Sequence, residues 1–197
     1  MILPLAVVST RQRTRAPMKT ATTARYTLTA MALHWLLAIA IVAVFGVGLY
    51  MEDLPRSPER LQLYAWHKWA GVSILALSAL RLLWRLAHRP PTEQPMPAWQ
   101  QRSAQAVHLV LYGLFFAVPL AGWAHSSAVG VPIVWFGVLQ LPDFVPVDKA
   151  LARDFKELHE AFAWALMVLV ALHVAAALKH QFIDRDGLIA RMWPGRG

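Results

Sequence analysis

The sequence predicts an all-α membrane protein: a four-transmembrane-helix bundle with both chain termini in the cytoplasm. Three observations lead to this prediction. Of the 197 residues, 57% are hydrophobic and only 15% are charged; four apolar runs are long enough to cross a bilayer; and the basic residues gather on alternate connections. A water-soluble bundle with unusually apolar helices is the alternative, but a soluble domain of this length would carry more charge.

The four apolar runs lie near residues 28–50, 65–87, 104–125 and 158–179. A helix needs about 20 residues to cross the hydrocarbon core of a bilayer. A chain inside that core must also satisfy its own backbone hydrogen bonds. Because no run shows the alternation of a barrel strand, we interpret each as a helix.

One membrane domain is expected over residues 25–197, because no internal repeat or Gly/Ser linker divides it. Residues 1–24 are expected to form a disordered N-terminal extension, and Met18 is an alternative start of the protein. The opening MILPLAVVS is a poor signal peptide, because its apolar stretch is short and its charges follow that stretch instead of preceding it.

The basic residues predict the orientation of the helices. They cluster before the first run, around the second connection and in the C-terminal tail, whereas the first and third connections mix both signs. The positive-inside rule therefore places both termini in the cytoplasm, and four spans agree with this placement. The net charge of +8 thus indicates orientation in the membrane, and no nucleic-acid partner is expected.

Histidine is the metal ligand that this sequence offers, because it has eight histidines and no cysteine. The lack of cysteine excludes thiolate metal sites, iron–sulfur clusters and cysteine-attached haem. His159 and His173 are fourteen residues apart, which is about 21 Å of helix and about 40° short of four full turns. They therefore lie on nearly one face, near opposite edges of a core about 30 Å thick. One metal ion cannot bind both, whereas two cofactors stacked across the membrane can.

Helix direction pairs these two histidines with two others. His34 lies near the cytoplasmic start of the first helix, and His67 lies near the periplasmic start of the second. The fourth helix runs inwards, so His159 is periplasmic and His173 is cytoplasmic. Depth therefore pairs His34 with His173 and His67 with His159. Two bis-histidine sites inside a four-helix bundle are what two b-type haems require, so these four histidines are the predicted iron ligands.

A haem is a broad plate, so the side chains next to its ligands must be small. The residue four positions after a histidine lies on the same helix face. After the four predicted ligands this residue is Ala38, Gly71, Ala163 and Ala177, but after His108 it is Tyr112. The alternative for each histidine is a structural, hydrogen-bonded ring, although ionisable groups inside membranes are usually functional.

Three further polar residues fall near the level of the cytoplasmic haem. His108 and His180 either lie at the interface or contact the head group of a quinone. Arg81 follows His67 by fourteen residues and so shares its helix face at the cytoplasmic depth. A charged group there needs a partner, and a haem propionate is the natural one. The alternative is an arginine that extends to the lipid head groups.

The third connection contains an apolar segment at 129–142 that two prolines and a glycine interrupt. We expect this segment to cap the periplasmic face, because a fifth span would reverse the charge topology. Cations follow it at helical spacing just before His159. Together with one cation beside His67, they could surround the mouth above the periplasmic haem; the four are Lys68, Lys149, Arg153 and Lys156. A solvated helix face is the alternative, because acidic residues are interleaved.

Several stretches, taken in their order and spacing, carry a resemblance to a known family. They are RYTLTAMALHW (25–35), WHKWAGVSIL (66–75), RLLWRL (81–86), HLVLYGLFFAVPLAGW (108–123), FGVLQLP (136–142), HE (159–160) and LHVAAALKH (172–180). Over about residues 25–195 the chain resembles the bacterial cytochrome b561 family, small four-helix dihaem membrane proteins. The family's haem ligands fall on His34, His67, His159 and His173, and its helix-three histidine, which is not a ligand, falls on His108.

The resemblance implies an oxidoreductase, because a characterised member of this family is a superoxide oxidase. Such a protein takes electrons from periplasmic superoxide and passes them through two haems to ubiquinone. The same fold also serves as the haem subunit of hydrogenases and formate dehydrogenases, which pass electrons between the quinone pool and a partner redox protein. A haem-binding sensor is the non-redox alternative, but two bis-histidine irons leave no open position for a gas.

Overall fold

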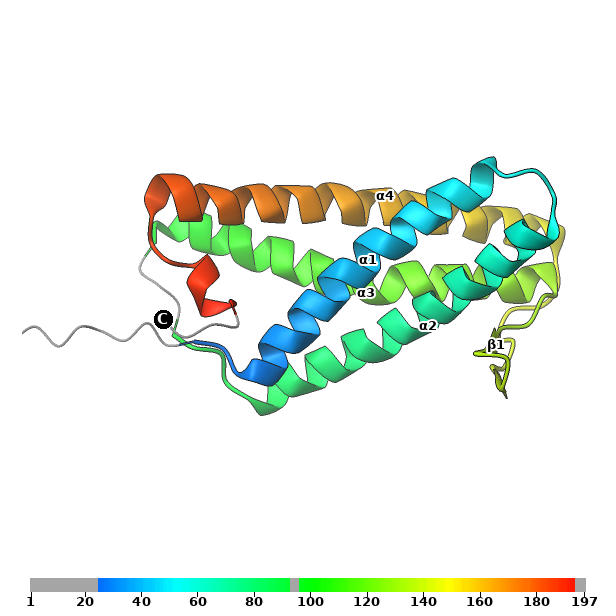
Figure 1. The fold of residues 1–197 in the computed structure, drawn as a ribbon, viewed down its shortest axis with the longest axis horizontal. Coiled ribbons are helices and arrows are strands. Elements are labelled where there is room, and N and C mark those ends of the chain that lie inside the picture. The colour runs from blue at the N-terminus through cyan, green and yellow to red at the C-terminus, as the bar shows by residue number, and fades with distance from the viewer. Residues whose placement is uncertain (1–24, 93–95, 194–197) are drawn as a thin grey trace, which may run out of the picture.

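The computed structural model describes residues 25–92 and 96–193, so the predicted extension over residues 1–24, with Met18, lies outside the described residues. Four long helices dominate the fold (Figure 1). They are α1 (Leu28–Asp53), α2 (Pro58–Ala87), α3 (Ala98–Val129) and α4 (Lys149–Lys179). All four are long and apolar enough to cross a membrane, which confirms the predicted four-helix membrane bundle.

Side-chain caps and one glycine set the helix ends. Thr27, Ser57 and Asp148 precede α1, α2 and α4, and each side chain accepts a hydrogen bond from a backbone N–H of the first turn. Pro58 begins α2, where its missing N–H leaves no helical hydrogen bond unmade. Gly130 ends α3 in the left-handed region, with φ at 77°. These signals lie outside the apolar runs, so the helices extend beyond the residues that the hydrophobic pattern marks.

Successive helices run antiparallel, and α1 packs on α2, α2 on α3, and α3 on α4 (Figure 1). Their shared core lies in the middle of the bundle and consists of buried Leu37, Ile41, Ile74, Leu111 and Leu166. Many large apolar side chains instead face outwards; Ile39 is 67% exposed and Leu172 is 58% exposed. Lipid tails solvate such side chains, which suits a bundle embedded in a bilayer.

The α3–α4 connection forms a small hairpin of β1 (Val134–Trp135) and β2 (Leu139–Gln140). It turns through Gly137, with φ at 73°. Two tryptophans fix the hairpin to α2: Trp69 Nε1 donates to the Val134 carbonyl at 2.6 Å, and Trp135 Nε1 donates to Ser73 Oγ at 3.3 Å. The segment predicted as a cap is therefore held against the end of α2 that carries His67.

Both ends of the described chain meet at the opposite end of the bundle (Figure 1). After α4 come a π-helical turn (His180–Asp184) and a 3₁₀ turn (Ile189–Arg191). The backbone N–H of Tyr26 donates to the Arg191 carbonyl at 3.2 Å. The buried guanidinium of Arg191 also donates to the Thr92 carbonyl at 2.7 Å, so the C-terminal segment joins α1 to the α2–α3 connection.

Candidate functional site

Four half-buried histidines form two facing pairs inside the bundle. The rings of His67 on α2 and His159 on α4 have centres 6.0 Å apart and an interplanar angle of 82°. The rings of His34 on α1 and His173 on α4 have centres 6.4 Å apart and an angle of 70°. These are the two pairs that helix depth predicts, and α4 supplies one member of each.

The spacing within each pair suits one metal ion held between two rings. Bonds from histidine nitrogen to a metal are about 2 Å long, so two imidazoles on one ion have centres about 6 Å apart. His108 contacts His173 from a different side, with ring centres 5.3 Å apart at 73°. That separation is shorter than either pair and matches a direct edge contact between rings.

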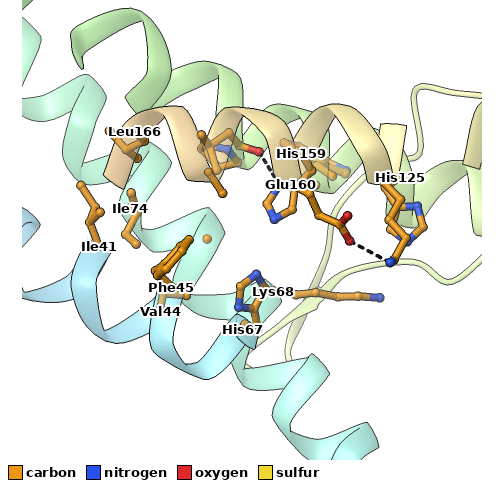
Figure 2. Close-up of a pocket in the computed structure, with 18 of the residues that line it drawn as sticks. Ile41, Val44, Phe45, His67, Lys68, Ile74, His125, His159, Glu160 and Leu166 are labelled. Atoms are coloured by element: carbon orange, nitrogen blue, oxygen red, sulfur yellow. Dashed lines mark hydrogen bonds and ion pairs between the residues drawn. The ribbon is translucent and has the colours of Figure 1, made fainter. Parts of the chain in front are cut away.

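A cavity of about 690 Å³ adjoins the His67–His159 pair, with both rings in its wall (Figure 2). Gly71 and Ala163, one turn after each ligand, also line it. Most of the other lining side chains are apolar, including Phe45. An apolar cavity of this size, with two convergent imidazoles, can hold a large flat ligand. The residues present therefore fit a haem with His67 and His159 as axial ligands.

The second nitrogen of each ring turns towards a helix backbone. His159 Nδ1 lies 2.9 Å from the carbonyl of Val118 on α3. A carbonyl only accepts, so Nδ1 carries the proton and Nε2 keeps the lone pair that a metal needs. His67 Nδ1 is buried and makes no hydrogen bond among the described residues, although the backbone of Val44 on α1 lies near the ring. His159 Nε2 is thus available to bind a metal ion.

Positive charge surrounds the start of α1 near the His34–His173 pair. The half-buried Arg81 donates from Nη1 to the carbonyl of Ala30 at 3.2 Å, one helical turn before His34. Its guanidinium also lies 6.0 Å from the centre of the Tyr112 ring. A second cavity, of about 190 Å³, is lined there by Arg25, Arg81, Arg85 and Arg89. Such a cavity suits anionic groups such as carboxylates, and its wall reaches Ala30 and Leu33, next to His34 on α1.

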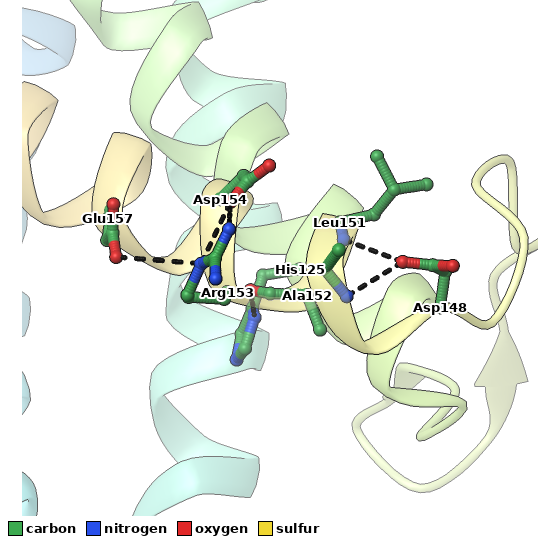
Figure 3. A network of polar contacts seen from close by, with 8 residues as sticks. His125, Asp148, Leu151, Ala152, Arg153, Asp154 and Glu157 are labelled. Carbon is green, nitrogen blue, oxygen red and sulfur yellow. Dashed lines mark hydrogen bonds and ion pairs between the residues drawn. The ribbon is translucent and has the colours of Figure 1, made fainter.

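The structure separates the four predicted periplasmic cations. Lys68 and Lys156 line the large cavity, whereas Lys149 and Arg153 are not among its described lining residues. Arg153 is exposed and pairs along α4 with Asp154 at 2.8 Å and with Glu157 at 3.9 Å (Figure 3).

Acidic side chains at the mouth also pair with Lys156. Its Nζ lies 3.0 Å from Glu52 and 2.7 Å from Glu160, so two carboxylates offset its charge. Lys68 instead donates to the Val131 carbonyl at 3.4 Å. Within the described ranges no carboxylate lies within ion-pair distance of Lys68, although Asp143 is close enough to act on its charge. Lys68 is therefore the cation of the predicted set whose charge is least offset at the cavity.

Other polar residues at this mouth are not apparent from the sequence. The hydroxyl of Tyr64 donates a hydrogen bond to Glu52 at 3.2 Å, and His125 Nδ1 bonds the Ala152 carbonyl at 2.8 Å. Tyr64, Glu52 and His125 all line the cavity. Of the acidic residues that line the cavity, Glu160 is the one that stands out in the sequence, because it is the single charged residue between His159 and His173. Glu52 reaches the site only because α1 and α4 converge at this end of the bundle.

His180 lies in the π-helical turn and contacts two carboxylates. Its Nδ1 is 2.6 Å from Asp186 and 3.2 Å from Asp184. The ring is largely buried, with 16% of the side chain exposed. One ring nitrogen is therefore held by an acid, and Nε2 is the nitrogen left for another partner.

Known proteins resemble this chain over nearly its whole length. The family model described as "Prokaryotic cytochrome b561" matches residues 25–195. The chain is 36% identical to "Cytochrome b561 homolog 2" of Escherichia coli (strain K12), over 88% of this chain and 93% of that protein. It is 31% identical to "Cytochrome b561 homolog 1" of the same organism, over 87% and 98%. It is also 28% identical to "Probable superoxide oxidase CybB" of Yersinia pestis, over 86% and 96%.

Family membership follows from the family match and these relatives, and the four long apolar helices and the facing histidines agree with it. The chain therefore belongs to the prokaryotic cytochrome b561 family and is a multi-pass, b-haem electron-transfer protein of the bacterial inner membrane.

Proposed function

We propose that this protein oxidises periplasmic superoxide to oxygen and reduces ubiquinone in the membrane. Two superoxide anions give up two electrons as two oxygen molecules form. One quinone takes up these two electrons and two protons to give the quinol. The observation that carries the proposal is the presence of two half-buried histidine pairs, 6.0 and 6.4 Å between ring centres, at two levels of one helix bundle.

The two pairs would each hold the iron of one b haem, and these haems would supply the redox centres between the two faces of the membrane. His67 and His159 would bind the periplasmic haem, and His34 and His173 the cytoplasmic one. Arg81, one turn from His34, would neutralise propionate charge at the cytoplasmic level. A charged group inside a membrane is stabilised by such a partner.

Lys68 would attract superoxide to the cavity. It follows His67 directly in α2, and its half-buried amine lies in the cavity wall. A positive charge at the mouth of a site raises the encounter rate with a small anion. Lys156 contributes less because Glu52 and Glu160 offset it. Lys149 and Arg153 lie outside the cavity lining and add to the longer-range field, which salt screens beyond about 8 Å.

The quinone would bind near His108 and His180 on the cytoplasmic side. His108 is exposed on α3 and contacts the ring of His173, so a quinone at His108 would lie close to the cytoplasmic haem. Quinone reduction consumes protons. The hydrogen-bonded pair of His180 and Asp186, 2.6 Å apart, would hold a proton for this step.

The test is quinol formation by purified protein in liposomes that contain ubiquinone. An enzymatic source supplies superoxide, and a matched sample contains added superoxide dismutase. We expect one quinol for every two superoxide anions consumed, with no quinol when the dismutase is present. If quinol forms only when a partner redox enzyme is supplied, the protein is a haem subunit of that enzyme and the proposal is wrong.

A further inference from the structure

Two glycines lie against the two rings of the periplasmic pair. A Cβ atom on Gly48 of α1 would lie 3.2 Å from His67 Cε1 and 3.7 Å from its Nδ1. A Cβ atom on Gly122 of α3 would lie 3.0 Å from His159 Nδ1 and 3.1 Å from its Cε1. A methyl group on either glycine would therefore press on the ring beside it, which would have to move by a few tenths of an ångström.

Each glycine also opens a backbone carbonyl to the ring. In an α-helix the N–H of residue i+4 bonds the carbonyl of residue i, so residue i+4 stands next to that carbonyl. Gly122 is four residues after Val118, whose carbonyl lies 2.9 Å from His159 Nδ1. Because Gly122 has no Cβ, the imidazole of His159 can approach α3 closely enough for its Nδ1 to reach this carbonyl.

The same spacing recurs on the other side of the cavity. Gly48 is four residues after Val44, whose backbone lies near the His67 ring, although His67 Nδ1 makes no hydrogen bond among the described residues. Neither α1 nor α3 supplies a ring to this pair. The ring from α2 therefore lies on α1, and the ring from α4 lies on α3, in each case at a glycine.

We infer that Gly48 and Gly122 are positioning residues that orient the two axial ligands of the periplasmic haem. Gly122 lets His159 direct Nδ1 to the Val118 carbonyl, and Gly48 lets the Nδ1 side of the His67 ring lie against α1. In both cases Nε2 is left for the iron position. A hydrogen bond from the second ring nitrogen fixes the orientation and the basicity of a metal-bound histidine. The inference rests on the part of the proposed function that makes His67 and His159 the ligands of one haem, but not on superoxide or quinone as substrates.

Other glycines in these helices have different surroundings. A Cβ on Gly71 of α2 would meet no described atom within 4 Å, and Gly71 lines the large cavity, where the haem plate would lie. Gly46 of α1 and Gly113 of α3 also have open space beside them, and neither is among the described residues that line the cavity. Gly46 and Gly113 are therefore matched controls on the same helices as Gly48 and Gly122.

The experiment compares Gly48→Ala and Gly122→Ala with Gly46→Ala and Gly113→Ala in the full-length, haem-loaded protein. Three quantities are measured: haem per chain, the electron paramagnetic resonance spectrum of the ferric haems, and the midpoint potential of each haem. We expect Gly122→Ala and Gly48→Ala to change the spectrum and midpoint potential of one haem, or to release that haem, and to leave the other haem unchanged. The two control variants should match the wild type. If the substitutions only loosened the packing of the bundle, thermal stability would fall and both haems would be affected alike.

Unchanged spectra and potentials in both Gly48→Ala and Gly122→Ala would overturn the inference, and so would equal changes in the control variants. If Gly122→Ala does not fold, Gly48→Ala decides, because its new methyl group would have the longer contact distance. His67→Ala and His159→Ala are measured in parallel, because they test whether these two histidines bind the haem at all. Loss of a haem in the histidine variants with no effect in the glycine variants would contradict only the positioning role.

Discussion

The rings of His67 and His159 lie 6.0 Å apart, centre to centre, although they belong to different helices and opposite halves of the chain. His34 and His173 repeat this relationship at 6.4 Å near the other end of α4. Because α4 contributes to both pairs, changes at its two histidines should affect two different redox centres.

Replacing one ligand should remove one haem. His67→Ala or His159→Ala should abolish the periplasmic haem, and His34→Ala or His173→Ala the cytoplasmic haem, because a low-spin bis-histidine iron needs both rings. Haem content per chain and a redox titration of the absorbance spectrum measure this. A variant that loses both haems equally, while remaining folded, would contradict the assignment of separate pairs.

His108→Ala should retain both haems. The rings of His108 and His173 have centres 5.3 Å apart, which is shorter than the about 6 Å expected for two axial imidazoles on opposite sides of one haem iron. We expect an unchanged haem content and a rate of quinone reduction that is lower by roughly tenfold, as for the loss of one hydrogen bond worth about 1.4 kcal/mol. Loss of a haem in His108→Ala together with its retention in His34→Ala would reverse the pairing.

Charge changes at the cavity should alter the rate with superoxide in opposite directions. Lys68→Glu should lower the second-order rate of haem reduction by about tenfold or more at low ionic strength. Glu52→Gln, which removes a carboxylate from the same mouth, should raise it. Stopped-flow measurements over a range of salt concentrations test both changes. Lys149→Glu is the control outside the cavity lining, and an effect of this variant as large as that of Lys68→Glu would argue against a specific role of Lys68.

The orientation of the bundle can be measured directly. A reporter fused after Gly197 should be active in the cytoplasm, and one inserted near Asp143 should be active in the periplasm, because basic residues flank the second connection and the tail. The described chain ends meet at one end of the bundle, and the β1–β2 hairpin lies at the other. A periplasmic signal after Gly197 would exchange the sides proposed for superoxide and quinone.

The helices and histidine pairs could be predicted from sequence because both depend on local periodicity. The apolar run at 158–179 marks the membrane part of α4, and the fourteen-residue spacing of His159 and His173 places them on one face of it. The apolar run does not predict that α4 begins at Lys149, because the first turns of the helix are polar. The start is instead set by Asp148, whose side chain caps the helix. Hydrophobicity reports contact with lipid, and not where a helix begins.

The surroundings of the site depend on contacts between distant segments, so the sequence did not reveal them. Lys156 pairs with Glu52 only because the ends of α1 and α4 meet, and nothing near either residue in the sequence indicates this. The role of Gly122 likewise depends on the ring of His159 from the neighbouring helix. The local acids that pair with Arg153 and Lys156 are visible in the sequence, but the pairing of Lys156 with Glu52 could be assigned only from the fold.

Reduction of the haems by superoxide tests the central proposal most directly. The purified, oxidised protein is mixed with superoxide in a stopped-flow spectrometer, and haem absorbance is followed with and without ubiquinone. We expect both haems to be reduced within the lifetime of superoxide and to be reoxidised when ubiquinone is present, with Lys68→Glu slowing only the first phase. If the haems stay oxidised in superoxide but are reduced by a quinol, the protein is a quinol-linked electron carrier and not a superoxide oxidase.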